Sequence, residues 1–297
     1  MSERIRKAVI PAAGFGTRFL PATKATPKEM FPLVDKPLAQ YVVEEAAAAG
    51  IEEIIFITGQ AKRAIEDHFD RNFELEYLLH SSGKDESLAA VRDISDLVSF
   101  AYVRQKEMKG LGHAVLQAKK LLNQEPFAVI LPDNVFSGAG PAIGDVIKTY
   151  DKVGTTVVGV KEVPEEQTRL YGIVSGEPAG TAAGEDVLKV TGIVEKPDPA
   201  DAPTRQAAIG RYVLSPAIFE ALESLKPDDG GEIQLAEAIH NLAGTEGVHT
   251  ATVSGEYHDA GDKLGYLQAV VEYALARDDL GPAFRKYLEE RLGSGND

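Results

Sequence analysis

The sequence predicts an α/β protein with a Rossmann-like, mixed and mostly parallel sheet flanked by helices, followed by a helical tail. Strand and helix patterns alternate through the first half, which is typical of a parallel sheet covered by helices. A glycine-rich turn follows the first buried strand, and residues 263–297 carry only helical patterns. A chain of 297 residues can bury one large core.

The first half alternates strands and helices in a regular order. Residues 7–13 read as a buried strand, and residues 37–49 read as a helix stopped by Gly50. No helix or strand is predicted for residues 70–98, which are polar and irregular in pattern. The other strands expected are 53–58, 99–105, 127–131 and 155–163, and the other helices are 61–69, 113–122 and 143–150.

The second half has shorter strands, separated by glycine- and proline-rich turns. We expect one α/β domain over residues 1–262 and a C-terminal helical tail over 263–297. The amphipathic pattern of the tail favours self-association, as a homodimer or homotetramer. The strands expected are 171–175, 187–195, 207–214 and 249–254, and the helices are 216–222, 233–242, 263–276 and 283–292.

The composition is that of a globular protein, with 44% hydrophobic and 26% charged residues. No window approaches eighteen apolar residues, and the N-terminal residues contain no signal-peptide pattern. The chain has no cysteine, which excludes disulfides, thiolate metal sites and cysteine catalysis. We therefore expect a cytoplasmic protein.

The net charge of −15 is unevenly distributed along the chain. Residues 1–40 hold seven Lys/Arg and three acids, which gives +4, so the remainder carries −19. An acidic body repels nucleic-acid backbones and anionic membranes, so neither is expected as a partner. The basic segment suggests one site for a small phosphate ligand, although charge counting alone would favour a solvated basic face.

The glycine loop runs from Ala12 to Arg18, directly after the first strand. Glycines at this place let the backbone approach a ligand closely and direct N–H groups at an anion. The loop matches neither a P-loop, because no Gly-Lys-Ser/Thr is present, nor the dinucleotide fingerprint, because Phe19 replaces its third glycine. A nicotinamide-dependent oxidoreductase is therefore disfavoured, but a lone Gly-x-Gly is weak and could be a structural turn.

A stiff, basic segment follows the glycine loop. Residues 19–30, the proline segment, contain Pro21 and Pro27 and carry Lys24 and Lys28. The segment is too rich in proline for a helix and too charged for a core strand. With Arg18 it holds three cations beside a glycine turn, an arrangement that suits a triphosphate.

The same residues resemble a known family. The run Gly14-x-Gly16-Thr17-Arg18-x-Leu20-Pro21-x-Thr23-Lys24-x-x-Pro27-Lys28-Glu29-Met30-x-Pro32-x-x-x-Lys36-Pro37 resembles the signature of bacterial UTP–glucose-1-phosphate uridylyltransferases, which are sugar nucleotidyltransferases. The related thymidylyltransferases share the Gly-x-Gly-Thr-Arg core but typically lack the Pro-Lys-Glu-Met block. The match therefore favours the uridylyl branch.

The resemblance continues in order along nearly the whole chain. Two departures affect fine contacts: Asn134 stands where Val or Asp is usual, and Met108-Lys109 replaces a more usual Pro-Leu. The matching segments are Val103-Arg104-Gln105, Gly110–Ala114, Leu131-Pro132-Asp133, Tyr171–Val174, Val194–Pro197, Gly210-Arg211-Tyr212, Gly230–Leu235 and Asp259–Tyr266.

The resemblance implies roles for particular residues. Gln105 and Glu29 would face the uracil edge, to which Gln105 would present both a donor and an acceptor, and Arg18, Lys28 and Lys196 would be catalytic. Gly172 and Glu195 would contact the sugar. The nucleotide pocket would be completed by Ala12, Ala13, Gly14, Gly16, Thr17 and Gly110.

Two acids are expected to hold Mg²⁺. Asp133 follows a buried strand, at the end where open α/β sheets place their ligands, and Asp259 precedes a glycine turn. Magnesium in proteins uses one or two carboxylates together with phosphates and water. Capping a turn would be the commoner role for Asp133 in isolation, whereas Asp262 is the better candidate to cap the helix that begins at Lys263.

Glu195-Lys196-Pro197 lies at the end of another strand. Lys196 could supply a compact charge to a monoester phosphate, while Glu195 accepts hydrogen bonds from sugar hydroxyls. An exposed ion pair between these two neighbours is the simpler alternative, and the residues alone would favour it. The six histidines show no metal-binding spacing.

The implied reaction is the synthesis of UDP-glucose and pyrophosphate from UTP and glucose-1-phosphate by in-line attack on the α-phosphorus, assisted by Mg²⁺. Three alternatives stay open. They are a thymidylyltransferase-like enzyme, a uridylyltransferase for another hexose-1-phosphate, and a non-catalytic regulatory member of the same fold. The last would usually have lost Arg18, Lys28, Asp133 or Lys196, and all four are present.

Overall fold

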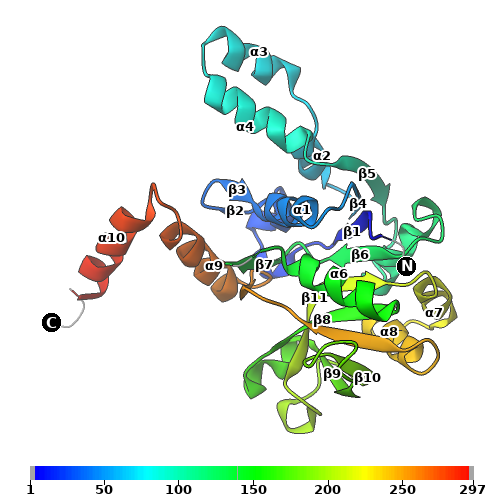
Figure 1. Ribbon diagram of the computed structural model, residues 1–297. Helices are drawn as coiled ribbons and strands as arrows, with labels where there is room; N and C mark the ends of the chain where they lie inside the picture. Colours follow the sequence, from blue (N-terminus) through cyan, green and yellow to red (C-terminus); the bar gives the residue numbers. More distant parts are fainter. Residues whose placement is uncertain (1–3, 139, 294–297) are drawn as a thin grey trace.

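The computed structural model describes residues 4–138 and 140–293 (Figure 1). Within these residues a nine-stranded sheet runs in the order β5-β4-β1-β6-β11-β8-β12-β10-β9. Its strands are β1 Lys7–Ala12, β4 Glu53–Thr58, β5 Ser99–Arg104, β6 Phe127–Ile130, β8 Thr156–Glu162, β9 Gly172–Pro178, β10 Leu188–Glu195, β11 Gln206–Leu214 and β12 Val248–Thr252.

The sheet is mixed, which confirms the predicted α/β architecture: the neighbouring strands β5, β4, β1 and β6 are parallel, and the remaining strands form antiparallel pairs together with one parallel pair, β8 with β12. β1 pairs in parallel with β4 and β6, and β4 pairs in parallel with β5. β11 then runs antiparallel to both β6 and β8, and β10 runs antiparallel to β9 and β12. The carboxyl ends of β1, β4, β5 and β6 therefore share one edge, where open sheets of this kind bind their ligands.

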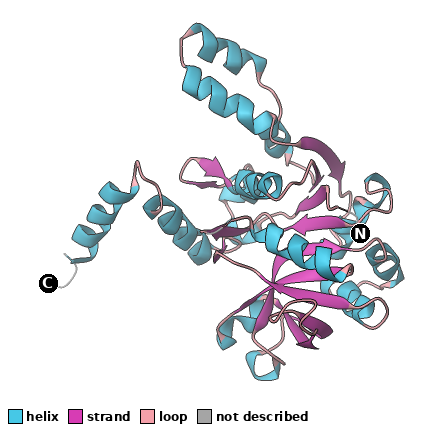
Figure 2. Cartoon of the chain, viewed as in Figure 1, coloured by secondary structure: helices cyan, strands magenta, loops and turns pink. Residues whose placement is uncertain are grey.

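The central strands are apolar on both faces because helices cover both sides of the sheet (Figure 2). In β1, Ala8 and Ile10 pack into one core cluster, whereas Val9 packs into another on the opposite face. The covering helices are α1 Leu38–Ala48 and α6 Ala142–Val153 on the first face, and α5 Gly110–Gln117, α7 Ile218–Ser224 and α8 Leu235–Ala243 on the second. The structure also contains α2 Arg63–Phe69, which follows β4, and the C-terminal helices α9 Lys263–Leu275 and α10 Gly281–Gly293.

Residues 70–98 depart from the sequence-based expectation. They contain two helices, α3 Phe73–Ser81 and α4 Asp85–Ser95, which project from the body as a hairpin (Figure 1). The helical pattern of these residues is weak because so little of the hairpin is buried. In α4, for example, the buried residue is Leu88. Ion pairs replace part of the missing apolar contact, because Arg71 and Arg92 both pair with the carboxylate of Glu76. Residues 82–84 connect the two helices.

Smaller differences from the predicted elements occur near the sheet edge. The helix predicted at 113–122 begins earlier, at Gly110, and a separate turn of 3-10 helix covers Lys119–Leu121. Two small antiparallel pairs were not predicted, β2 Pro32–Leu33 with β3 Lys36–Pro37 and β7 Asn134–Ser137 with β13 Glu256–Asp259. The second pair places Asp259 opposite Asn134, so segments more than a hundred residues apart meet beside the sheet edge.

The helix α9 packs onto the segments that follow the first strand. Asp262 caps it as expected, accepting hydrogen bonds from Leu264 N at 2.8 Å and Gly265 N at 3.0 Å. The Tyr266 ring meets the rings of Phe19 and Phe31 edge-on, with centroid separations of 5.8 Å. Its hydroxyl donates to the carbonyl of Pro32 at 2.7 Å.

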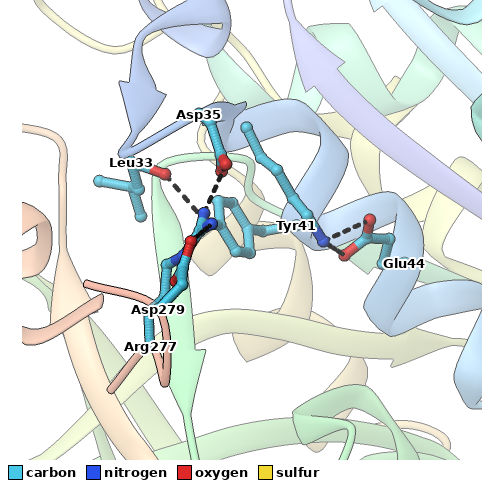
Figure 3. Close-up of polar contacts among 7 residues, drawn as sticks. Leu33, Asp35, Tyr41, Glu44, Arg277 and Asp279 are labelled. Carbon is cyan, nitrogen blue, oxygen red and sulfur yellow. Dashed lines mark hydrogen bonds and ion pairs between the residues drawn. The ribbon is translucent and has the colours of Figure 1, made fainter. Parts of the chain in front are cut away.

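Beyond α9, Arg277 ties the chain to the turn between β2 and β3. Its guanidinium contacts Asp35 at 2.5 Å and Asp279 at 2.6 Å, beside the Tyr41 hydroxyl, which donates to Leu33 O (Figure 3). The helix α10 then extends away from the body (Figure 1). None of the helices within residues 4–138 and 140–293 is both long and apolar enough to cross a bilayer.

The β2–β3 turn contains a backbone strain that predicts a stabilising substitution. Val34 has φ of +66°, and it is the first of the two central residues of the turn. A β-branched residue is disfavoured there, whereas a two-residue turn with positive φ at this position prefers glycine. We expect Val34→Gly to stabilise the protein by about 1 kcal/mol, measured by urea unfolding, after the entropic cost of glycine is subtracted.

Val34→Ala is the matched control, because it shortens the side chain but keeps the Cβ atom that causes the strain. It should be no more stable than the wild type. A Val34→Gly protein as stable as Val34→Ala would contradict the assignment of strain.

Candidate active site

Two adjoining cavities lie at the carboxyl edge of the parallel strands. The first, of about 270 Å³, is lined by residues of β9, β10 and α8 together with Arg18 and Asp259. The second, of about 300 Å³, lies against the glycine loop and the start of α5. Asp133 lines both, as do Leu111, Leu131 and Glu232. The two cavities thus form one two-part cleft with a carboxylate at the junction.

The glycine loop is packed tightly against the loop that follows β4. A Cβ atom at Gly59 would lie 2.8 Å from the carbonyl oxygen of Ala13, so the two backbones touch directly. Gly16 has φ of +64°, in the left-handed region, and its carbonyl accepts a hydrogen bond from Thr23 Oγ1 at 2.8 Å. The loop is therefore held in a bent form that leaves Gly14 exposed at the second cavity.

Short 3-10 turns run from the end of the glycine loop through the proline segment. They cover Thr17–Phe19, Ala22–Lys24 and Lys28–Met30. The last turn directs Lys28 at the cleft and buries Glu29. Lys24, predicted as a third cation of the cradle, is exposed and lines neither cavity.

Lys28 and Asp133 form the central ion pair of the cleft. Lys28 Nζ lies 2.5 Å from Asp133 Oδ2, and both side chains are about one-fifth exposed, at 22% and 21%. Burial opposes ionisation of both groups, but the attraction between them prevails: the pKa of Lys28 is raised and that of Asp133 is lowered. The pair is charged, and it places a lysine where a phosphate could replace its carboxylate partner.

Asp133 and Asp259 converge on one point. A Cβ atom at Gly261 would lie 2.8 Å from Asp259 Oδ1 and 3.1 Å from Asp133 Oδ2. The backbone fixes the approach, because Ala260 N donates to Asp133 O and Gly261 N donates to Asp259 Oδ1, each at 2.8 Å. Burial and the neighbouring charge of Asp133 both raise the pKa of Asp259. The site thus concentrates negative charge that no described cation fully balances.

This pair fits a hard divalent cation. All of its donor atoms are carboxylate oxygens, and the pKa of Asp259, raised by burial and by the charge of Asp133, reflects how closely the two carboxylates approach. Within residues 4–138 and 140–293 there is no group of three or more His, Cys, Asp or Glu side chains arranged to hold a metal. Two carboxylates are sufficient for Mg²⁺ when substrate phosphates and water complete its shell.

Gln105 lies in the second cavity, although it is oriented differently from the expectation. Its Nε2 donates to Gly110 O at 3.2 Å and lies 2.9 Å from His113 Nδ1. The carbonyl of Gly110 can only accept, so this contact fixes the orientation of the amide. Burial, together with Lys109, lowers the pKa of His113, which keeps the ring neutral and able to accept. Gln105 therefore offers its Oε1 as an acceptor, rather than both a donor and an acceptor.

Lys196 lines the first cavity in a strained backbone conformation. Its φ is +45°, and its N–H donates to the carbonyl of Tyr171 at 3.0 Å. The ammonium pairs with Glu195 at 2.9 Å, as the simpler interpretation expects, and the lysine side chain is 53% exposed. Both residues nevertheless line the cavity together with Gly172 and Asp259. A non-glycine residue held with positive φ at a cavity wall is often a functional position.

The structure brings most of the predicted site residues into the cleft. Arg18, Asp133, Gly172, Glu195, Lys196 and Asp259 line the first cavity, and Ala13, Gly14, Lys28, Glu29, Gln105, Gly110 and Asp133 line the second. Ala12, Gly16 and Thr17 line neither. Ala12 is buried at the end of β1, and the other two shape the loop.

Two further residues organise the site: Arg211 had no individual role in the sequence-based prediction, and Tyr171 belonged only to a segment that resembles the family's sugar site. The side chain of Arg211 is fully buried, and it donates to the carbonyls of Leu131 at 3.2 Å and Asn134 at 2.7 Å, on either side of Asp133. Its charge is balanced by Glu45 at 2.7 Å. Tyr171 donates its hydroxyl to Asp259 Oδ2 at 3.2 Å. An arginine within an otherwise apolar strand was the available signal, because a buried arginine requires a partner.

The fold, the glycine loop and the paired acids define the class of protein. The family model described as nucleotidyl transferase matches residues 7–275, and the chain belongs to this family. A relative from Bacillus subtilis (strain 168), the UTP–glucose-1-phosphate uridylyltransferase YngB, is 48% identical over 290 residues, covering 98% of this chain and 96% of the relative.

The chain is also similar to solved structures. A UTP-bound UGPase from Acinetobacter baumannii superposes with a TM-score of 0.88 at 42% identity, covering 96% of this chain and 99% of that one. A UDP-glucose pyrophosphorylase complexed with UDP-glucose superposes with a TM-score of 0.83, also at 42% identity, covering 92% of this chain and 100% of that one. The predicted family and fold are confirmed.

Proposed function

We propose that the chain transfers the uridylyl group of UTP to glucose-1-phosphate, forming UDP-glucose and pyrophosphate. The observation that carries this proposal is the two-part cleft with Asp133 at its junction. One part offers a glycine loop, Lys28 and Gln105 to a nucleotide, and the other offers Lys196 and Glu195 to a sugar phosphate. The names of the relatives that match nearly the whole chain support the same reaction.

The chemistry requires no nucleophilic side chain. A phosphate oxygen of glucose-1-phosphate attacks the α-phosphorus of UTP in line, and a new P–O bond forms as the bond to the bridging oxygen breaks. The electron pair of the broken bond leaves with pyrophosphate. Because the nucleophile is already an anion, no general base is needed, and the residues act by positioning and by balancing charge.

Two cations serve the nucleotide in this proposal. Lys28 can exchange its contact with Asp133 for the α-phosphate, and its raised pKa keeps it charged at neutral pH. Arg18 is exposed at the first cavity, and its Nη1 lies 3.5 Å from the carbonyl of Gly261, a long contact that a phosphate can displace. An exposed guanidinium can fork onto the phosphate oxygens that depart with pyrophosphate.

Asp133 and Asp259 would hold Mg²⁺, the metal that their oxygen donors favour. When bound, this ion supplies positive charge that polarises the phosphates and balances the charge of the transferring group. Tyr171 keeps Asp259 in place through its hydroxyl. Arg211 fixes the backbone on both sides of Asp133.

Selectivity among nucleotides tests the nucleotide half of the cleft. It also distinguishes a uridylyltransferase from the thymidylyltransferase-like alternative. Gln105 Oε1 can accept the N3–H of uracil, whereas cytosine presents an unprotonated acceptor at that position. We expect UTP to be strongly preferred over CTP and dTTP to be rejected more weakly, measured as kcat/KM for each nucleotide with glucose-1-phosphate. Equal turnover of all three would contradict the base pocket.

A substitution of Lys196 tests the sugar-phosphate half of the cleft. Lys196→Ala should raise the KM for glucose-1-phosphate and lower kcat, because a phosphate loses a charged partner, whereas UTP binding measured by calorimetry should change little. Arg18→Ala should instead weaken UTP binding directly. If Lys196 serves only its exposed pair with Glu195, the substitution would leave the kinetics unchanged and would cost less than about 1 kcal/mol of stability.

We also propose that the C-terminal tail predicted from residue 263 onward mediates self-association in a cytoplasmic enzyme; its described part comprises α9 and α10, and residues 294–297 lie outside the described residues. The described part of α10 exposes Tyr287 and Leu292, at 57% and 76%, on a helix that extends from the body (Figure 1). Tyr287→Asp should lower the mass measured by sedimentation if this face joins copies of the chain. An unchanged mass would place the self-association surface elsewhere.

A further inference from the structure

Glu29 is a buried carboxylate that is only half satisfied. Its exposed fraction is 1%, and it lines the nucleotide cavity beside Gln105 and Gly14. Glu29 Oε2 accepts a hydrogen bond from Lys62 Nζ at 2.7 Å, whereas Oε1 has no partner among the described residues. A buried oxygen without a partner is costly, and at a cavity wall it is a position where a ligand can donate a hydrogen bond.

Lys62 is an equally buried cation, and it comes from a different part of the fold. It follows β4 and immediately precedes α2, and its side chain is 6% exposed. A buried ammonium needs a close partner to remain charged, and the contact with Glu29 supplies it. Lys62 lines neither part of the cleft, so it reaches the site only through Glu29.

The charges around Glu29 indicate what Lys62 does. Burial raises the pKa of Glu29, and the opposing influences are Lys62 and, from the neighbouring position, Lys28. Lys28 already holds Asp133 at 2.5 Å and turns to the phosphates in the proposed reaction. Lys62 is therefore the cation committed to Glu29 in both states of the site.

We propose that Lys62 is a positioning residue for nucleotide recognition: it keeps Glu29 ionised and aims the free Oε1 at a proton of the bound nucleotide. This inference rests on the proposed function and extends it to the loop after β4. Gln105 Oε1 and Glu29 Oε1 then form a pair of acceptors along one side of the cavity. Such a pair accepts from the N3–H of uracil and from a ribose hydroxyl, and it disfavours a base that presents an acceptor at the same place.

The test uses UTP binding by calorimetry with the full chain, so that no chemical step enters the measurement. Lys62→Met removes the charge but keeps the length of the side chain. We expect UTP to bind at least about tenfold more weakly at pH 7, because the isolated Glu29 carboxyl takes up a proton. The affinity relative to the wild type should recover as the pH rises to 9 and the carboxyl ionises, a dependence that a purely structural role would not produce.

Two further variants show whether Lys62 acts through Glu29. Glu29→Gln should weaken UTP binding by a similar factor, and this loss relative to the wild type should not change with pH. The double variant Glu29→Gln/Lys62→Met should bind UTP within about twofold of Glu29→Gln alone, because the effects of residues that act as one unit are not additive. This comparison also serves if the single Lys62→Met chain fails to fold. Lys106→Met, a change at an exposed lysine next to Gln105, is the matched control and should bind UTP like the wild type.

Three results would overturn the proposal. If Lys62→Met binds UTP like the wild type with the same pH profile, or if the losses of the two single variants multiply in the double variant, Lys62 has no part in nucleotide recognition, while the proposed function stays intact. A wild-type chain that binds no UTP would overturn the proposed function, and this inference with it.

Discussion

Asp133→Asn should remove nearly all activity. The substitution keeps the shape of the side chain but abolishes the charge that pairs with Lys28 and, with Asp259, would hold the metal. The loss of a metal's contribution is worth several kcal/mol, so we expect kcat to fall by about 10²- to 10⁴-fold. The measurement is pyrophosphate release at saturating UTP, glucose-1-phosphate and Mg²⁺, with circular dichroism to show that the variant is folded.

Asp262→Asn is the matched control for this change. Asp262 is a neighbouring carboxylate that caps α9, a task that asparagine performs about as well. Its activity should stay within about twofold of the wild type, since a cap substitution of this kind costs little. A folded Asp133→Asn protein with near-wild-type activity would show that the metal site has been assigned to the wrong residues.

Arg211→Met should produce the largest loss of stability of any single substitution considered. Its guanidinium is fully buried, so its removal leaves Glu45 without its buried cation and deprives the carbonyls of Leu131 and Asn134 of a donor. Breaking a buried pair in this way typically costs about 3–5 kcal/mol. We expect this decrease in the free energy of unfolding by urea titration, together with lower activity, because the backbone that carries Asp133 is no longer held.

Two comparisons sharpen this prediction. The double variant Arg211→Met/Glu45→Gln should be less destabilised than Arg211→Met alone, because no charge is left buried and unpaired. Arg277→Met, which breaks the more exposed pair with Asp35, should cost no more than about 1 kcal/mol. Equal losses of stability for Arg211→Met and Arg277→Met would show that the buried pair of Arg211 contributes no more to stability than the more exposed pair of Arg277.

The parallel half of the fold could be predicted from the sequence because its signals are local. The segment 53–58 has a continuous apolar run at its centre and forms β4 with the predicted bounds, and the acids and glycines that follow the strands lie at the shared edge. The hairpin of α3 and α4 could not be predicted in the same way. Helical periodicity is visible when one face is buried, and this hairpin has almost no buried face.

The candidate site was predictable where a residue follows a strand or belongs to the family pattern, as Asp133 and Lys28 do. The orientation of Gln105 was not, because it depends on Gly110 and His113, which meet the amide only after α5 has formed. The supporting residues Arg211 and Lys62 were missed for a related reason. Each acts through partners far away in the sequence, Glu45 and Glu29, and no local pattern reveals such pairs.

The most direct test of the proposed reaction is to mix the wild-type chain with UTP, glucose-1-phosphate and Mg²⁺ and to follow the phosphorus species by NMR. The two-part cleft predicts that UDP-glucose and pyrophosphate appear in equal amounts, and that UTP is not consumed when the sugar phosphate is omitted. UTP consumption without UDP-glucose, or no consumption with both substrates present, would contradict uridylyl transfer.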